Sequence, residues 1–362
     1  MRILHVINDT GLGGAQTLIE SLATDAPRID MDVHCLVLSA PGVLSERLEE
    51  VCQSVSYLDI SRESWRVDRA VVAVHKAIGR ISPDLVQSHL LQSDLISAIA
   101  LWFRPRMPLV WTIHSSGYGS GDRWRTRTLA KIIRIIAVRP QRVVACTDSA
   151  AQFAISQGIT PSKIVTIRNG TVLPQWNAPG SRTDAMRLVH VGRMHAMKDH
   201  NTLLTCFALL TDSIPGISLT CVGANGDELA VLSSGASKPE ANRIHALGSV
   251  KDPIPIIRSS DFLIISSSYG EALPMSGIEA LALGVPVLTT SVGSCPELVV
   301  EPWQMCPPND PIALANVALT ASKLSNAQYR ELSQNSRKLA EKKFDIEQTS
   351  SSYLSLYEEV VS

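Results

Sequence analysis

The sequence predicts an α/β protein made of two doubly wound, Rossmann-like domains that face a central cleft. Short apolar segments alternate with helical segments along the whole chain, as expected of parallel sheets covered on both faces. The chain has 362 residues, of which 45% are apolar, so each half can bury its own core. In addition, Arg2-Ile-Leu-His-Val and Arg187-Leu-Val-His-Val begin two similar series of strands, which indicates two domains of one kind in tandem.

Each domain is expected to contain its own series of strands. The strands of the first are expected at residues 3–7, 33–38, 85–88, 109–113 and 143–146, and those of the second at residues 188–191, 218–222, 244–247, 262–265 and 287–289. Residues 172–183 are rich in Pro, Gly and polar residues and have no periodicity, which is typical of a linker. We therefore expect domains at 1–175 and 176–345, followed by a last helix at 346–362.

Composition excludes several classes of protein. The net charge of −1 argues against a general nucleic-acid binder. The seven cysteines are scattered and form no Cys-x-x-Cys pair, so a reduced, cytoplasmic protein is expected. The N-terminus has no signal-peptide core, and the longest apolar run is too short to span a bilayer.

The loop after the first strand contains Gly13 and Gly14 and precedes a helix expected at 17–23. Glycines let a backbone approach a ligand closely. Their spacing does not match Gly-x-Gly-x-x-Gly, so a nicotinamide dinucleotide is not favoured. Two interpretations remain: a tight turn, or backbone amides that touch a phosphate or a sugar.

The second domain has a comparable loop, in which Gly192 ends a strand and Arg193 and Lys198 follow. Two cations at the carboxyl end of a sheet suit a diphosphate and can neutralise the charge of a leaving group. The alternative is a pair of solvated surface side chains.

The most specific segment joins the strand at 262–265 to a helix expected at 275–283. Pro274 suits a first helical position, and Gly284 followed by Pro286 suits a helix end. A strand, a polar loop and a helix N-terminus form a common anion site. Glu271 and Glu279, with seven residues between them, suit the hydroxyls of a ribose or of a sugar attached to that anion.

His114 and His89 each follow or end a strand. His114 is a candidate for contact with a ligand, with a structural hydrogen bond as the alternative, whereas a structural role is favoured for His89. Asp30 and Asp32 form an Asp-x-Asp, but they precede a strand and so lie at the wrong edge of the sheet for a metal-dependent nucleotide site. No His/Cys cluster has zinc spacing, so neither a metal nor a cofactor is expected.

Residues 101–142 carry nine basic residues and one acidic residue. A helix there would place Arg123, Arg127, Lys131 and Arg134 on one face, beside an apolar face of Trp124, Leu129, Ile132, Ile133 and Ile136. Such a helix can lie on an anionic bilayer. The alternative is a solvated basic face on a helix packed against its own sheet.

Taken together, these segments resemble the family-4 retaining glycosyltransferases of the GT-B fold over nearly the whole chain. The matching residues are Gly13-Gly14, Pro83-Asp84 with His89, His114, Asn169-Gly170, Gly192-Arg193 with Lys198, Val222-Gly223, Leu247-Gly248, Glu271 with Glu279, Gly293 with Glu297, and Phe344 with Tyr353 and Tyr357. Three positions depart from the pattern of the family. Gln16 replaces a glutamate, the glycine of Glu-Gly-Phe stands before Glu271, and Ser294 replaces a glycine.

The resemblance implies metal-independent transfer of a hexose or N-acetylhexosamine from a UDP-sugar, or less favourably a GDP-sugar, with retention. The acceptor would be a glycan or a polyisoprenoid-linked glycan in bacterial surface polysaccharide synthesis, at the inner face of the plasma membrane. A nucleotide-sugar epimerase or hydrolase on the same fold, or a silent binding subunit, is the alternative.

The resemblance also implies roles for particular residues. Arg193 and Lys198 would hold the diphosphate, Glu271 and His114 would contact the transferred sugar, and Glu279 would contact the ribose. The rest of the donor site would consist of Gly13, Gly14, Gly192, Gly223, Val250, Ala272, Leu273, Pro274 and Met275.

Overall fold

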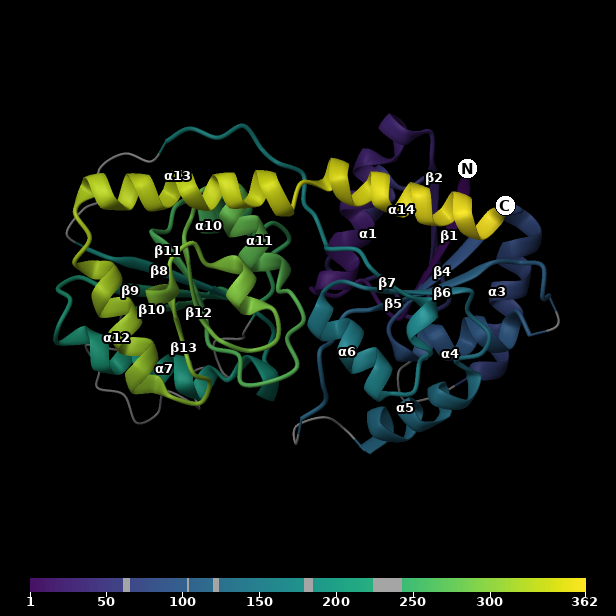
Figure 1. The fold of residues 1–362 in the computed structure, drawn as a ribbon, viewed down its shortest axis with the longest axis horizontal. Helices are drawn as coiled ribbons and strands as arrows, with labels where there is room; N and C mark the ends of the chain where they lie inside the picture. Colours follow the sequence, from purple (N-terminus) through teal and green to yellow (C-terminus); the bar gives the residue numbers. More distant parts are fainter. Residues whose placement is uncertain (61–65, 103, 120–123, 179–184, 224–242) are drawn as a thin grey trace. The chain divides into compact units, whose positions relative to one another are not determined.

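The computed structural model describes residues 1–60, 66–102, 104–119, 124–178, 185–223 and 243–362 (Figure 1). Its contacts divide the chain into two compact units. The N-terminal unit comprises Met1–Val172 together with Ile346–Ser362, and the C-terminal unit comprises Leu173–Asp345. Each unit is built around its own parallel sheet, which confirms the predicted pair of parallel-sheet α/β domains.

The N-terminal unit contains a seven-stranded sheet in the order β3-β2-β1-β4-β5-β6-β7, with every adjacent pair parallel. Its strands are β1 (Arg2–Ile7), β2 (Asp32–Val37), β3 (Ser54–Tyr57), β4 (Leu85–His89), β5 (Leu109–Ile113), β6 (Arg142–Ala145) and β7 (Ile164–Thr166). Its helices are α1 (Gly14–Asp25), η1 (Ala26–Ile29), α2 (Ser45–Val51), α3 (Val67–Ile81), α4 (Leu91–Ala100), α5 (Trp124–Ile136), α6 (Asp148–Ser156), η2 (Pro161–Lys163) and α14 (Ile346–Val361).

The two faces of this sheet bury separate cores. Side chains at alternate positions of a strand point to opposite faces. Accordingly, Ile3 packs with residues of α1 and α14, whereas Leu4 packs with residues of α3, α4 and α5. Both cores consist mainly of aliphatic side chains, which is the pattern expected of a parallel sheet covered on both sides.

The C-terminal unit contains a six-stranded parallel sheet in the order β10-β9-β8-β11-β12-β13. Its strands are β8 (Arg187–Val191), β9 (Ser218–Val222), β10 (Ile244–Ala246), β11 (Phe262–Ile265), β12 (Val287–Thr290) and β13 (Met305–Cys306). Its helices are η3 (Ala196–Lys198), α7 (His200–Thr211), α10 (Ile254–Arg258), α11 (Met275–Ala282), η4 (Cys295–Leu298), η5 (Pro302–Gln304), α12 (Pro311–Ser322) and α13 (Asn326–Lys343).

Every strand expected from the sequence is present, with ends shifted by one residue at most. Three further strands were missed: β3, β7 and β13 have only four, three and two residues, so a period of two cannot be recognised in them. The first helix begins at Gly14 and ends at Asp25, and is therefore longer than the expected 17–23.

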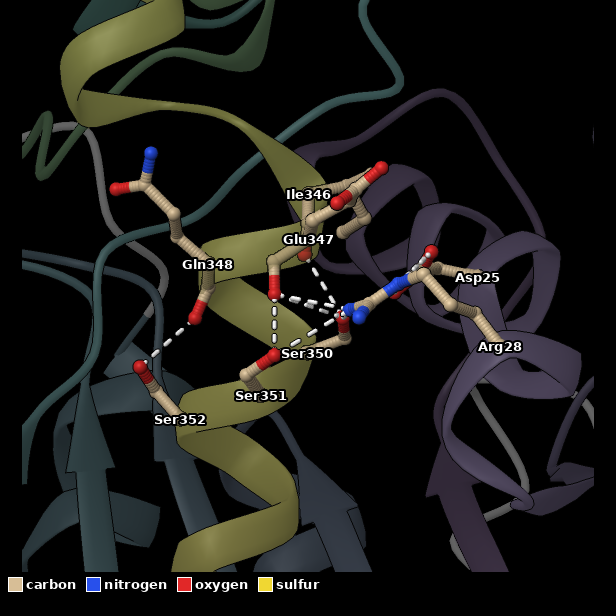
Figure 2. A network of polar contacts seen from close by, with 8 residues as sticks. All are labelled: Asp25, Arg28, Ile346, Glu347, Gln348, Ser350, Ser351 and Ser352. Atoms are coloured by element: carbon tan, nitrogen blue, oxygen red, sulfur yellow. Dashed lines mark hydrogen bonds and ion pairs between the residues drawn. The ribbon is translucent and has the colours of Figure 1, made fainter.

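Helix α14 is part of the N-terminal unit although it is the last element of the chain (Figure 1). Figure 2 shows its polar attachment: Arg28 donates to the carboxylate of Asp25 at 2.9 Å and to Ser350 Oγ at 2.9 Å, and Ser350 Oγ also donates to Asp25. One and two turns further on, respectively, Tyr353 and Tyr357 are fully buried in the core. The helix therefore completes this core.

The expected linker begins at the boundary between the units, and its first residues are held by the C-terminal unit. Arg337 Nη1 donates to the carbonyl of Pro174 at 2.9 Å. The indole of Trp176 lies so close to Gly284 that a Cβ there would meet Trp176 Nε1 at 2.3 Å. Residues 179–183 of the expected linker lie outside the described residues. None of the helices in the described part of the chain has the length and apolar character needed to cross a membrane.

Candidate functional site

A buried ion pair lies at the carboxyl edge of the C-terminal sheet. Lys198 Nζ donates to Glu271 Oε1, and the two side chains are only 14% and 7% exposed. Ser267 Oγ donates to the same carboxylate oxygen at 2.9 Å. Two of the residues predicted for the site are thus in direct contact although they are 73 positions apart.

Polar side chains that the sequence analysis did not single out support this pair. Ser266 Oγ donates to the carbonyl of Lys198 at 2.7 Å, which fixes the turn that carries the lysine. Thr290, at the end of β12, donates to the carbonyl of Ser267 at 2.6 Å. The signal in the sequence is a run of serines directly after the apolar strand β11.

Helix α11 begins directly after the loop that carries Glu271. Pro274 is its N-cap, with φ −68° and ψ 121°, and is therefore one residue before the first helical position predicted for it. The helix is followed by Gly284 at φ 71°, as predicted for a left-handed C-terminal residue. The amide of Gly277 donates to the carbonyl of Pro274 at 3.0 Å. The two amides before it, at the start of the helix, have no acceptor one turn earlier in the helix and form an end with partial positive charge. Four residues predicted for the donor site, Ala272, Leu273, Pro274 and Met275, are buried here, and Glu279 is half-buried in the helix.

Two glycine-containing loops touch at the ends of β8 and β9. A Cβ on Gly223 would lie 2.8 Å from the carbonyl oxygen of Gly192. A Cβ on Gly192 would in turn lie 3.2 Å from Lys198 Cδ. The close approach places the Lys198 stem against backbone, while Arg193 is exposed and Val250 is half-buried.

We predict that Gly223→Ala destabilises the C-terminal unit by about 2 kcal/mol, because φ of 92° is strained for alanine and its methyl group would meet backbone. Urea unfolding measures the change. Gly79→Ala is the matched control, because nothing lies within 4 Å of a Cβ there and Gly79 is inside α3. The control is expected to gain up to about 1 kcal/mol. Equal effects of the two substitutions would contradict the close approach of the loops.

Gln16 organises the first glycine loop, in which Gly13 is the N-cap of α1 and Gly14 its first residue. Gln16 Nε2 donates to both the carbonyl oxygen and Oδ1 of Asp9 at 3.0 Å, and Asp9 Oδ1 also accepts from the amide of Gly11 at 3.0 Å. A glutamate has no donor for these bonds. At this position, where the chain departs from the family pattern, the glutamine is therefore the residue that can donate hydrogen bonds to Asp9.

We predict that Gln16→Glu destabilises the N-terminal unit by about 2 kcal/mol, since it removes two hydrogen bonds and sets two carboxylates against each other. Adding Asp9→Asn should restore most of the loss, because the new amide can donate to the new carboxylate. The test compares the melting temperatures of the parent, of Gln16→Glu and of the double variant. If Asp9→Asn did not restore stability to Gln16→Glu, this account of the loop would be contradicted.

In the N-terminal unit, His114 is hydrogen-bonded to His89 through Nε2 and Nδ1, which are 3.1 Å apart. This bond joins the two histidines singled out from the sequence, and it is the structural hydrogen bond given as the alternative for His114. His89 Nε2 in turn lies 2.9 Å from His5 Nδ1, a contact that the sequence analysis did not foresee. Burial lowers the pKa of His114 to about 4 and that of His5 to about 3, so both are neutral at pH 7.

The predicted basic helix corresponds to α5, but its faces differ from those expected. Leu129 and Ile133, expected on the apolar face offered to a bilayer, are buried in the core, as in the alternative of a helix packed against its own sheet. Ile132 is 41% exposed and does not share their face. Lys131 and Arg134 are exposed. Of the other two basic residues, Arg123 lies outside the described residues, and for Arg127 only its position within α5 is described.

Asp30 and Asp32 lie at the amino-terminal end of β2, the edge on which the sequence places them. All seven cysteines are free and buried. Within the described ranges, no group of three or more His, Cys, Asp or Glu side chains could hold a metal ion.

The profile of Glycosyltransferase Family 4 matches residues 12–173, and that of Glycosyl transferases group 1 matches residues 176–339. A glycogen synthase of Mycobacterium tuberculosis is 24% identical over 64% of this chain, and the match spans 58% of that protein. The capsular polysaccharide biosynthesis glycosyltransferase CapH of Staphylococcus aureus is 25% identical, over 77% of this chain and 78% of CapH.

The crystal structure of HepE from Anabaena in complex with UDP-glucose superimposes with a TM-score of 0.83, covering 99% of this chain and all of HepE at 19% identity. This likeness shows the fold, which is GT-B. With the two profiles covering successive halves of the sequence, the chain belongs to the family-4, group 1 glycosyltransferases.

Proposed function

We propose that this chain transfers a hexose or N-acetylhexosamine from a nucleotide diphosphate sugar, with UDP favoured over GDP, to a glycan or lipid-linked acceptor. The observation that carries the proposal is the pair Lys198–Glu271 beside the first turn of α11. In this pair, Lys198 is a cation suited to phosphate and Glu271 is an acceptor suited to sugar hydroxyls, and both lie at the same edge of the sheet. HepE has been solved with UDP-glucose, and CapH is named for capsular polysaccharide biosynthesis.

In this proposal, Lys198, Arg193 and the N-terminus of α11 neutralise the charge that develops on the departing diphosphate. A bound metal ion is not required for this, because two side-chain cations and a helix end supply the positive charge. Glu271 accepts from hydroxyls of the transferred sugar, Glu279 accepts from the ribose, and His114 contacts the sugar. Retention of configuration is proposed from the family to which the chain belongs.

The testing experiment measures thermal stabilisation by UDP, GDP, ADP and their sugar conjugates, with EDTA present. A ligand that binds the folded protein raises its melting temperature by mass action. We expect a shift with uridine nucleotides, and then transfer of one sugar to a glycan acceptor with retained anomeric configuration, detected by NMR of the product.

Each other outcome contradicts a part of the proposal. Release of free sugar without an acceptor requirement indicates a hydrolase, and interconversion of conjugates indicates an epimerase. Binding without turnover indicates a silent subunit. If none of these ligands raises the melting temperature, the chain has no nucleotide-sugar site of the kind proposed.

We further propose that α5 brings the enzyme to an anionic membrane. Beside Lys131 and Arg134, the exposed apolar side chains of Ile132, Ile135 and Val138 are 41%, 75% and 69% exposed. Exposed apolar side chains among basic ones are typical of a helix that inserts at the level of the lipid headgroups, and are less typical of a helix face that only contacts water.

Sedimentation with vesicles of phosphatidylglycerol, and with vesicles of phosphatidylcholine as the control, tests this role. Each basic residue near an anionic surface contributes about 1 kcal/mol. Replacing both Lys131 and Arg134 by Glu is therefore expected to lower binding to the anionic vesicles by more than about tenfold. Unchanged binding of the variant, or equal binding to both lipids, would exclude this role of α5.

A further inference from the structure

Three serines, Ser266, Ser267 and Ser268, directly follow β11, and we call them the serine run. In an extended chain, successive side chains point to opposite sides. The hydrogen bonds of the serine run alternate in the same way. The side chains of Ser266 and Ser268 donate to the turn η3, which carries Lys198, whereas the side chain of Ser267 donates to Glu271. Three neighbouring residues thus contact both segments that contribute to the ion pair.

Ser266 and Ser268 hold the turn η3. Ser266 Oγ donates to the carbonyl of Lys198 at 2.7 Å, and the amide of Ser268 donates to the carbonyl of Met197 at 2.9 Å. Ser268 Oγ donates to the carbonyl of Ala196 at 3.3 Å. A single helical turn has little stability of its own, because it fixes several residues for few hydrogen bonds. The position of the Lys198 backbone therefore depends on these bonds from the serine run.

Ser267 holds the carboxylate of Glu271. It is fully buried, and its Oγ donates at 2.9 Å to Oε1, the oxygen that also accepts from Lys198 Nζ. Two donors thus meet at one carboxylate oxygen, so rotation of the carboxylate would break at least one of these bonds. Ser267 is itself fixed, because Thr290 Oγ1 donates to its carbonyl at 2.6 Å. The direction of the Glu271 carboxylate therefore depends on Ser267 as well as on Lys198.

The two tasks are divided between the serines. Among the described residues, the hydroxyls of Ser266 and Ser268 donate to η3 alone, and the hydroxyl of Ser267 donates to Glu271 alone. Ser266 and Ser267 have no exposed surface, so they can act on a ligand only through the groups that they hold. In the proposed function, Lys198 binds the diphosphate and Glu271 binds the transferred sugar. Loss of each hydroxyl should therefore weaken the binding of a different part of the donor.

We propose that Ser266 and Ser267 are positioning residues for two different parts of the nucleotide sugar: Ser266, with Ser268, places the cation for the diphosphate, and Ser267 places the carboxylate for the sugar. The inference rests on the proposed function for the identity of the ligand. The division of tasks is a property of the hydrogen bonds within the protein, so it can also be tested without a ligand.

The first test uses double-mutant cycles in urea unfolding of the full chain. Ser267→Ala and Glu271→Ala remove the two sides of one hydrogen bond, so together they should lower stability by less than the sum of their separate losses. Ser266→Ala does not remove a contact of the Glu271 side chain, and its loss should add to that of Glu271→Ala. Equal coupling of both serines to Glu271, or no coupling of Ser267, would overturn the division of tasks.

The second test compares the affinities for UDP and for UDP-glucose, UDP-galactose and UDP-N-acetylglucosamine by titration calorimetry. Ser266→Ala is expected to lower the affinities for UDP and for the conjugate that binds by the same factor, about fivefold. Ser267→Ala should leave the affinity for UDP unchanged. It should lower the affinity for the conjugate about tenfold, the order expected for one hydrogen bond to a charged group.

Three further variants serve as controls. Ser260 is buried in the same unit and its Oγ donates to the carbonyl of Ile256 at 2.9 Å, outside the site, so Ser260→Ala should leave both affinities unchanged. Ser267→Cys retains the volume of the side chain but has only a weak donor, and should behave like Ser267→Ala. Ser268→Ala, at a half-buried position, should act in the same direction as Ser266→Ala and replaces that variant if it does not fold.

An equal loss of affinity for UDP in Ser267→Ala and Ser266→Ala would mean that the serine run stabilises the site as a whole and divides no tasks. The same loss in Ser260→Ala would assign the effect to the stability of the unit. If the parent bound none of these uridine nucleotides, the proposed function would be refuted, while the unfolding cycles would still decide whether the two serines act separately.

Discussion

Replacing Lys198 with methionine is expected to lower kcat/KM for the sugar donor by about 10²–10³-fold, the usual effect of removing one group that stabilises charge in a transition state. The same substitution leaves the carboxylate of Glu271 buried without its cation. Removal of one partner of a buried ion pair costs about 3 kcal/mol or more. Loss of turnover and loss of stability should therefore appear together, in steady-state kinetics and urea unfolding respectively.

A double variant separates the two effects. In Lys198→Met with Glu271→Gln, no charge is left unpaired, and the new amide can still accept from Ser267 Oγ. Most of the stability should return while turnover remains low. If instead Lys198→Met retained kcat/KM within about threefold of the parent, the lysine would not act on the leaving group. If the double variant regained turnover, the loss in the single variant would have been structural.

Asp94→Asn is expected to stabilise the N-terminal unit by about 2 kcal/mol at pH 7. Asp94 is 1% exposed, and burial raises the pKa of its carboxyl to about 8, with the bond from Ser88 acting in the opposite direction. In the unfolded chain this carboxyl has its ordinary pKa of 3.8. At pH 7, folding must therefore protonate this group, a cost of up to about 4 kcal/mol. Asparagine has no such cost, because it does not ionise. Its side-chain oxygen can still accept the hydrogen bond from Ser88 Oγ, which now lies 2.6 Å from Asp94 Oδ1.

The pH dependence of this gain identifies its cause. A raised folded-state pKa contributes stability that is fully present below about pH 4 and is lost as the pH rises toward 8. The advantage of Asn over Asp should accordingly grow by about 1.4 kcal/mol per pH unit between pH 5 and 7, in urea unfolding of both proteins. Asp148→Asn is the control, since its side chain is 77% exposed, and should change stability by less than about 0.5 kcal/mol. A gain that does not vary with pH would contradict the assignment of a neutral Asp94.

The sequence predicts those parts of the structure that depend on short segments. Alternating apolar strands and helices are sufficient for two parallel sheets, because each strand is recognisable by itself. The start of α11 and its end at Gly284 follow from Pro274 and Gly284, which act through local backbone geometry. Candidate site residues were found for a related reason: polar residues directly after an apolar strand lie at the carboxyl edge of a parallel sheet.

Contacts between distant segments could not be predicted in the same way. The pairing of Lys198 with Glu271 depends on how β8 and β11 are aligned, and no residue near either partner specifies that alignment. The contact between His5 and His89 depends likewise on the register of β1 with β4, so His5 gave no signal of its own. The faces of α5 were misjudged at Ile132, because helical spacing defines a stripe but not which edge of the stripe the sheet covers.

The return of α14 to the N-terminal unit has a consequence for the order of events during synthesis on a ribosome. The strands of this unit are translated before those of the other unit, but its core lacks Tyr353 and Tyr357 until α14 emerges. The C-terminal unit, by contrast, is continuous in sequence and can fold while α14 is still being synthesised. The first unit to be translated is thus the last to be completed, and it waits with an open apolar face through the synthesis of the whole of Leu173–Asp345. Such a nascent chain exposes apolar surface in the part synthesised first, and termination of translation before α14 would damage the unit whose strands are translated first.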